Sequence, residues 1–180
     1  MYIGRQKDYP VWTETKDCEG FVYKHKVAPM FGEVKYVKLS PTAQTPTQGS
    51  PMAAGYDLYA DLEGKDMIAL HPGEVRKIST GIAIALPMGT FGAVYARSGM
   101  ATKRGLAPVN KVGVIDADYR GPVIVALKNE SNELQIIDHG ERIAQLVVTP
   151  FVSVTFTEEE TIGTTARGDG GFGSTDKTNR

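Results

Sequence analysis

The apolar residues of this 180-residue chain recur at every second position in short runs from Val34 onward, and this spacing most constrains the fold. The segments Ile82–Leu86 and Val123–Leu127 are two examples. An interval of two places side chains on one face of a β-strand, whereas an amphipathic helix needs intervals of three and four. Glycine, proline and aspartate separate the runs, as they do at turns. The pattern predicts an all-β domain, a barrel or a sandwich, with helix as the minority state.

The run at 123–127 is apolar at its alternate positions too, since Ile124 and Ala126 occupy them. A strand that is apolar on both faces is typical of the middle of a sheet, so we expect this strand to be central. The same pattern predicts further strands at Val34–Leu39, Phe91–Ala96, Arg142–Val148 and Phe151–Phe156.

The two ends of the chain differ from this patterned region. Residues 1–33 show no alternation that predicts a strand, and their acidic residues argue against a mitochondrial transit peptide. Residues 164–180 are polar and rich in glycine, with too little apolar surface to fold alone. We therefore expect an N-terminal extension of unknown role at 1–33, one β domain at 34–163 and a mobile C-terminal arm at 164–180.

Charge and composition exclude several classes of function. The chain has 20 basic and 21 acidic residues, a net charge of −1, which predicts no binding of nucleic acid and no binding at a membrane surface. Cys18 is the single cysteine, and His25, His71 and His139 lack the spacing of zinc ligands. With no apolar run of about 20 residues and no signal-peptide pattern, we expect a soluble protein of the cytoplasm or nucleus.

Two carboxylates stand two residues apart in the segment Gly113–Gly121, whose sequence is GVIDADYRG. Asp116 and Asp118 follow an expected strand and would project to the same side if the chain stays extended. One of them could then act as an acid or a base. The alternative is a hairpin turn with a solvated carboxylate, which we favour for an isolated match.

Asp57 lies in an otherwise apolar and aromatic segment, AGYDLYA at 54–60. A lone buried carboxylate is costly, so this side chain needs a cation or hydrogen-bond donors. It could equally cap a turn or pair with an arginine, which is the more frequent outcome for a single aspartate.

Phosphate-binding groups occur in two places. Arg97, Ser98 and Gly99 supply a guanidinium, a hydroxyl and free backbone amides, although a solvated surface turn would have the same composition. The arm contains RGDGGFGST at 167–175, in which glycines permit close approach to an anion. The lysine that a P-loop requires is absent there. Acids together with phosphate-binding groups favour phosphorus chemistry with an oxygen-ligated cation such as Mg²⁺.

In this order, these segments resemble the five motifs of the trimeric dUTP diphosphatase (dUTPase) family, and the resemblance covers everything after about Val34. It implies a jelly-roll-like β subunit, a homotrimer with active sites at the subunit interfaces, and hydrolysis of dUTP to dUMP and pyrophosphate with Mg²⁺. That reaction keeps uracil out of DNA and supplies dUMP for thymidylate synthesis. The motifs are AGYDL at 54–58, RSG at 97–99, GVIDADYRG at 113–121, GERIAQL at 140–146 and RGDGGFGST at 167–175.

The resemblance also implies roles for individual residues. Asp116 matches the acid that activates the attacking water, and Asp57 matches the acid that holds magnesium through water. Tyr119 matches the ring that packs on the sugar and leaves no room for a ribose 2′-hydroxyl. The remaining implied substrate-binding residues are Asn110 and Gly113 at the uracil, Arg97, Ser98, Gly99 and Gln145 at the phosphates, and Arg167, Phe172, Gly173 and Ser174 in the closing arm.

The chain departs from the family pattern in the extension 1–33 and in Pro122, which removes a backbone donor beside the uracil hairpin. The dCTP deaminase branch of the same fold is a weaker match, because its catalytic glutamate after an Arg-Ser-Ser motif is absent. A protein that senses dUTP without turnover and binds an unknown protein partner through 1–33 is the alternative from another class.

Overall fold

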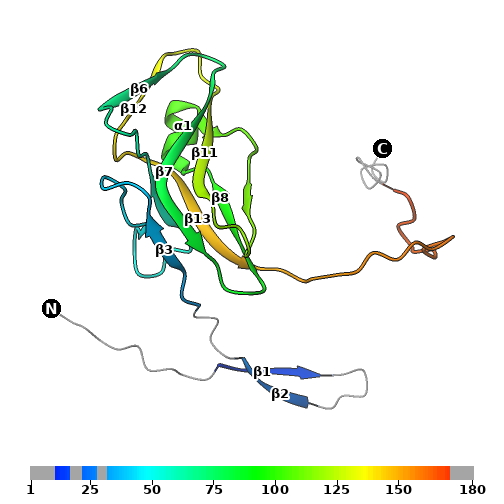
Figure 1. The fold of residues 1–180 in the computed structure, drawn as a ribbon. Helices are drawn as coiled ribbons and strands as arrows, with labels where there is room; N and C mark the ends of the chain where they lie inside the picture. Colours follow the sequence, from blue (N-terminus) through cyan, green and yellow to red (C-terminus); the bar gives the residue numbers. More distant parts are fainter. Residues whose placement is uncertain (1–10, 17–21, 28–31, 171–180) are drawn as a thin grey trace.

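The alternating runs form two sheets in the structure, a computed structural model that describes residues 11–16, 22–27 and 32–170. One sheet has the strand order β10-β8-β13-β5-β4, and the other has the order β3-β7-β11-β9. Figure 1 labels β8 and β13 of the first sheet and β3, β7 and β11 of the second. All strand pairs are antiparallel. The strands are β3 (Lys35–Lys38), β4 (Thr47–Gln48), β5 (Tyr56–Tyr59), β7 (Val75–Ala85), β8 (Thr90–Tyr95), β9 (Leu106–Pro108), β10 (Gly113–Ile115), β11 (Pro122–Asn129) and β13 (Arg142–Pro150).

The core lies between the two sheets and follows the period of two. In β11, Val123, Val125 and Leu127 are buried whereas Ile124 is half exposed. This strand lies between β7 and β9, so the prediction that it is central is confirmed. The opposite sheet contributes buried side chains such as Leu58 and Leu146. The predicted all-β, jelly-roll-like fold is confirmed.

A two-stranded sheet and one short helix complete the domain. β6 (Met67–Leu70) pairs with β12 (Gln135–Asp138), and α1 (Ser98–Arg104) follows β8. α1 ends at Gly105, whose φ of 65° is the left-handed conformation that favours glycine at a helix C-terminus. Arg104 in the last turn donates to the Gln135 side chain at 3.0 Å and also contacts Glu141, so the helix is tied to β12 and to the start of β13. No helix in the described part of the chain is long and apolar enough to span a membrane.

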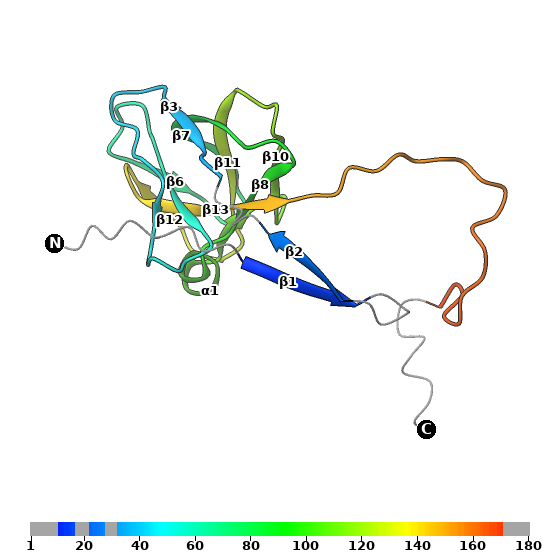
Figure 2. The same ribbon diagram turned by 90° about the horizontal axis from the view of Figure 1, so that it is seen from below.

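The prediction of a strand at Phe151–Phe156 is wrong. β13 ends at Pro150, and the next residues form no strand and extend away from the sandwich in Figure 1 and in Figure 2. Val152 and Phe156 are 84% and 95% exposed. The alternating pattern is present, but a strand also needs a neighbour for its backbone hydrogen bonds, and no strand among the described residues pairs with this segment.

The N-terminal extension contains two strands that the sequence pattern did not predict. β1 (Val11–Lys16) pairs with β2 (Val22–Val27) in antiparallel register, with Val11 opposite Val27. Both segments contain β-branched and aromatic residues, which favour strands, but polar residues interrupt their apolar period. Propensity rather than alternation was the available signal.

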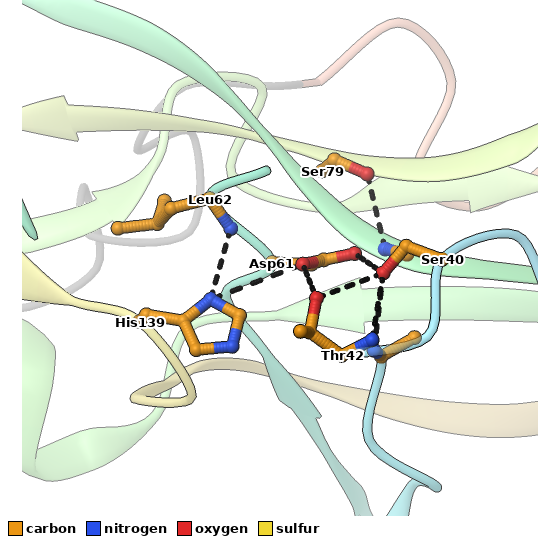
Figure 3. A network of polar contacts seen from close by, with 8 residues as sticks. Ser40, Thr42, Asp61, Leu62, Ser79 and His139 are labelled. Atoms are coloured by element: carbon orange, nitrogen blue, oxygen red, sulfur yellow. Dashed lines mark hydrogen bonds and ion pairs between the residues drawn. The ribbon is translucent and has the colours of Figure 1, made fainter. Parts of the chain in front are cut away.

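A buried carboxylate fixes the chain between β3 and β4 (Figure 3). Asp61 accepts hydrogen bonds from the hydroxyls of Ser40 and Thr42, the second at 2.8 Å. The Nδ1 atom of His139 lies 3.8 Å from the Asp61 carboxylate and accepts the backbone N–H of Leu62 at 3.2 Å. One side chain thereby joins segments that precede β4, follow β5 and precede β13.

Candidate active site

Three strands bring the predicted phosphate-side residues together. Gln145 of β13 lies directly opposite Asp57 of β5 on one side and opposite Tyr95 of β8 on the other. Directly opposite residues point to the same face of a sheet, about 5 Å apart. Arg97 and Ser98 follow Tyr95 after one residue, at the start of α1. Motif segments that are 40 residues apart or more in the sequence therefore meet on one face of the five-stranded sheet, at its three middle strands.

Asp57 is bound by two arginines on this face of the sheet. The carboxylate is 11% exposed and accepts a hydrogen bond from Arg97 Nε at 2.7 Å on one oxygen. Arg142 Nη1 lies 3.3 Å from the other oxygen. Pairing with an arginine was the alternative that the sequence left open, and the structure shows it. The pairing compensates the cost of burying this carboxylate.

Arg142 is a residue of this group that the sequence prediction missed. It belongs to the segment GERIAQL at 140–146, but strict alternation would place it on the opposite face from Gln145. The register of β13 shifts between Arg142 and Ala144, so Arg142 lies opposite Tyr59 and shares the face of Asp57. A β-bulge of this kind reverses the facing of the residues beyond it. The sequence alone gave no sign of the bulge.

Gln145 is held by the short segment between β8 and α1 that carries Arg97. Its Nε2 atom donates to the carbonyl of Ala96 at 2.9 Å. A Cβ atom on Gly55 would lie 2.6 Å from the Gln145 Oε1 atom, so the glycine of the first motif makes room for this amide. Gly99 differs from Gly55, because a Cβ there would meet open space within the first turn of α1.

The predicted uracil and sugar residues lie on a separate segment, which runs from β9 in one sheet to β10 in the other and into the turn after β10. β9 leads into a turn at Asn110, and β10 then pairs with β8, placing Gly113 opposite Val94. Asn110 lies beside Gly113, because the Asn110 Nδ2 atom would be 3.4 Å from a Cβ at that glycine. The chain turns again after β10, where the N–H of Tyr119 donates to the carbonyl of Asp116 at 3.1 Å. The two carboxylates therefore lie in a turn, and both Asp116 and Asp118 are exposed.

Asp116 and Tyr119 line one pocket of about 200 Å³. The turn puts the carboxylate and the ring on the same small cavity, which suits a base that acts beside a packed sugar. The other lining residues come from β10 and from the start of β11 and are mostly apolar: Val114, Ile115, Pro122, Val123 and Ile124.

The phosphate-side group and this pocket do not meet within the chain. Asp116 follows Ile115, which pairs with Gly92 of β8, whereas Gln145 pairs with Tyr95 of the same strand. β10 and β5 are three strand spacings apart in the sheet. At about 3.3 Å per residue and 4.8 Å per strand, Asp116 and Asp57 are separated by roughly 15 to 20 Å.

The arm is described as far as residue 170. Arg167 is exposed, and its Nε donates to the carbonyl of Gly170 at 2.9 Å within a turn of the arm. Phe172, Gly173 and Ser174 lie outside the described residues, so their predicted roles stay predictions. A second cavity of about 630 Å³ is lined by apolar residues of β3, β5, β7 and β13 and contains none of the predicted site residues.

Comparison with known proteins extends the sequence resemblance. The dUTPase family profile matches residues 42–176. A deoxyuridine 5′-triphosphate nucleotidohydrolase of Desulfitobacterium hafniense is 44% identical over 144 residues, covering 79% of this chain and 94% of the relative. The enzyme of that name from Candida albicans is 48% identical over 140 residues, covering 77% and 84%.

Solved structures of dUTPases are similar to this chain as well. A mutant dUTPase of Staphylococcus bacteriophage 80alpha with dUpNHpp superimposes with a TM-score of 0.71 at 28% identity, covering 79% of this chain and 98% of that one. A mutant dUTPase of phage phi11 of S. aureus, described with a structural Mg(II) ion, gives a TM-score of 0.64 at 25% identity, covering 73% and 99%. The chain belongs to the dUTPase family.

Proposed function

We infer that this chain hydrolyses dUTP to dUMP and pyrophosphate. The observation that carries the inference is the meeting of Asp57, Arg97, Arg142 and Gln145 on one face of the five-stranded sheet, from three motif segments. Guanidinium and amide donors gathered there suit the charged oxygens of a triphosphate. The nucleotidohydrolases that cover most of the chain at over 40% identity support the same reaction.

We assign the chemistry to the pocket of Asp116 and Tyr119. Asp116, as a carboxylate, takes a proton from the water that attacks the α-phosphorus, a role commonly worth about 10² to 10⁴ in rate. Tyr119 packs on the deoxyribose and excludes a 2′-hydroxyl, while Asn110, Gly113 and the backbone between Asn110 and Gly121 contact the uracil. Arg97, Ser98, Gly99 and Gln145 bind the phosphate side. These roles rest on the motif matches and on the placement described above.

Magnesium is proposed as a cofactor that enters with the nucleotide. Among the residues that the structure describes, no three His, Cys, Asp or Glu side chains are grouped as metal ligands. Each Asp57 oxygen already faces an arginine, so this carboxylate suits contact with a metal-bound water better than direct ligation of the metal. Mg²⁺ commonly binds through substrate phosphates and one or two carboxylates, and this donor set fits that mode. When bound, the ion would stabilise the negative charge that develops on the leaving pyrophosphate.

We propose a homotrimer whose active sites are shared between subunits. The main support is the separation of about 15 to 20 Å between Asp57 and Asp116 within one chain, which leaves each group without the other. A second support is apolar surface: Val114 on β10 and Ile124 on β11 are 63% and 48% exposed beside the Asp116 pocket. Contiguous exposed apolar side chains mark surfaces that partners cover.

The ends of the chain keep their proposed roles. We propose that the arm at 164–180 closes over a neighbouring subunit's site, with Arg167 and Ser174 on the terminal phosphate and with Phe172 stacked on uracil and Gly173 beside it. Its exposed course after Pro150 is consistent with reaching another subunit. The β domain at 34–163 holds the remaining motifs. We propose the extension at 1–33, whose role the motifs do not define, as a candidate contact for an unknown protein partner.

The test is pyrophosphate release from dUTP, dCTP, dTTP and UTP, each with Mg²⁺ and with a chelator. We expect rapid release from dUTP alone, and only with the metal. Asp116→Asn should abolish release while the trimer and dUTP binding remain. Near-normal activity of Asp116→Asn would contradict its role as the base. Tight dUTP binding without release by the unmodified protein would favour the nucleotide-sensing alternative.

A further inference from the structure

We propose that Gly121 and the backbone carbonyl of Pro122 determine the sugar selectivity of the enzyme, because together they fix the ring of Tyr119. The proposal rests on the proposed function, in which this ring excludes the 2′-hydroxyl of a ribonucleotide. A ring can exclude one oxygen atom only if its position is fixed to within a fraction of that atom's size. The structure identifies three contacts that fix it.

The first contact is with the bare Cα of Gly121. A Cβ atom at this position would lie 2.4 Å from the Tyr119 hydroxyl oxygen and 2.7 Å from the ring carbon that bears it. Gly121 is not among the glycines with positive φ. The proximity of the ring, and not the backbone conformation, therefore requires glycine here.

The second contact holds the outer end of the ring. The Tyr119 hydroxyl donates to the carbonyl of Pro122 at 3.1 Å. That carbonyl belongs to an irregularity in β11, whose register with β7 shifts between Pro122 and Ile124. The next carbonyl, that of Val123, accepts the hydroxyl of Thr80 at 2.7 Å. Side-chain hydroxyls thus bind both carbonyls at the bulge, and one of these hydroxyls is that of Tyr119.

The third contact holds the inner end of the residue. The Tyr119 N–H donates to the Asp116 carbonyl, so the turn sets the ring three residues from the carboxylate on the same pocket. Tyr119 is nevertheless 44% exposed. Gly121 therefore lies against the hydroxyl end of the ring, and the residue keeps surface available to a ligand. A ring seated in this way sets how close C2′ of a sugar can come.

The decisive substitution is Gly121→Ala. Its new methyl group would occupy the space beside the Tyr119 hydroxyl and would introduce no left-handed backbone strain. The ring is the far end of an exposed side chain, so it should move aside at little cost in stability. We expect the ratio of kcat/KM for UTP to that for dUTP to rise about tenfold, from partial loss of a steric discrimination worth about a hundredfold. Gly49→Ala is the matched control, since a Cβ there meets nothing within 4 Å, and it should leave the ratio unchanged.

Two further variants test whether the glycine acts through the ring. Tyr119→Phe removes only the hydrogen bond to Pro122, and we expect a smaller rise in the same ratio. Adding Gly121→Ala to Tyr119→Ala should produce no further rise. An unchanged ratio in Gly121→Ala, or an equal rise in the Tyr119→Ala background, would overturn the proposal.

The proposal can fail separately from the proposed function. Wild-type protein that releases no pyrophosphate from dUTP would contradict the function itself. Wild-type turnover together with an unchanged ratio in Gly121→Ala would contradict only the proposal that Gly121 fixes the position of the Tyr119 ring. If Gly121→Ala does not fold, Tyr119→Phe decides, and an unchanged ratio in that variant would overturn the proposal.

Discussion

At the scale of single residues, the Asp57 carboxylate shows how burial and function are combined. Its two oxygens face different arginines, one from the segment after β8 and one from β13. A buried carboxylate left without one of its partners is destabilised, so each arginine contributes to keeping the charge in place. Arg97 also makes a 3.4 Å contact through Nη1 with the carbonyl of Arg142, which joins the two arginines directly.

We predict that Arg142 is energetically coupled to Asp57. In a double-mutant cycle of Arg142→Ala and Asp57→Asn, the free energies of unfolding should deviate from additivity by about 0.5 to 1 kcal/mol, because the half-exposed arginine is partly screened by solvent. Urea denaturation without nucleotide measures this, and 1 M NaCl should reduce the coupling. Arg76→Ala is the control, since Arg76 pairs with its near neighbour Glu74 and not with Asp57. Additive losses at low salt would contradict the prediction.

A second residue-scale prediction concerns Asp61. Burial acts to raise the pKa of this carboxyl, but hydrogen bonds from Ser40 and Thr42 outweigh it and hold the pKa below its ordinary value. A lowered pKa in the folded state means that the stabilisation is fully present above about pH 4 and is lost as the pH falls through the folded-state pKa. The unfolding free energy should therefore fall more steeply below about pH 4 in the wild type than in Asp61→Asn. Equal acid sensitivity of the two proteins in urea titrations would refute this.

Much of the site was predictable at this scale because motif residues carry their chemistry in their side chains. Asp57, Arg97 and Gln145 were identified from their segments, and the structure brings them together. Arg142 was missed because its facing depends on a bulge, and the contact of Tyr119 with Gly121 was missed because it depends on ring position. Both are properties of geometry that residue types do not encode.

At the scale of elements, β7 shows how one glycine shapes a strand. The strand runs from Val75 to Ala85, but Gly81 has a φ of 68°, a left-handed value inside it. A Cβ there would lie 2.2 Å from an Asp61 carboxylate oxygen and 2.7 Å from the Ala43 Cβ. The glycine therefore allows β7 to approach both the Asp61 network and the chain before β4.

We predict that Gly81→Ala destabilises the domain by about 3 kcal/mol, from left-handed strain together with overpacking. Gly89→Ala is a matched control, because Gly89 has a φ of 76° but a Cβ there meets nothing within 4 Å. That variant should lose only about 1 kcal/mol. Urea denaturation of both variants separates the two contributions, and equal losses would show that close packing at Gly81 carries no cost.

The elements themselves were predicted unevenly for a physical reason. Runs with strict alternation, those of β11 and of the last part of β7 from Ile82, were identified because their apolar side chains are buried in their own chain. Short strands such as β4 and β6 carry too few residues to show a period. The segment Phe151–Phe156 has the period of two, but it pairs with no strand in the described part of the chain. An alternating pattern indicates that one face of a segment is apolar, and it does not identify the element or the chain that buries this face.

At the scale of the whole molecule, the sheet places the two halves of the proposed site at different positions. Asp57, Arg97 and Gln145 gather near the end of β8 at Tyr95, whereas Asp116 follows Ile115 of β10, which lies opposite Gly92 of β8 and three strand spacings from the β5 strand of Asp57. In the proposed trimer, a substrate would therefore reach these two groups on different subunits. Deleting residues 164–180 should then abolish turnover without unfolding the domain, because the described part of this arm is exposed and contributes little burial. Aggregation of the truncated protein would contradict that expectation.

Shared sites predict complementation between two inactive proteins. Asp116→Asn lacks the base but keeps its arm, and the truncated protein lacks the arm but keeps Asp116. If each site takes these two parts from different subunits, random trimers of an equal mixture have both parts intact at about one site in four. Co-expression with two affinity tags, isolation of mixed trimers and a dUTP turnover assay would measure this. Mixed trimers without activity would mean that the base and the arm of each site belong to one chain.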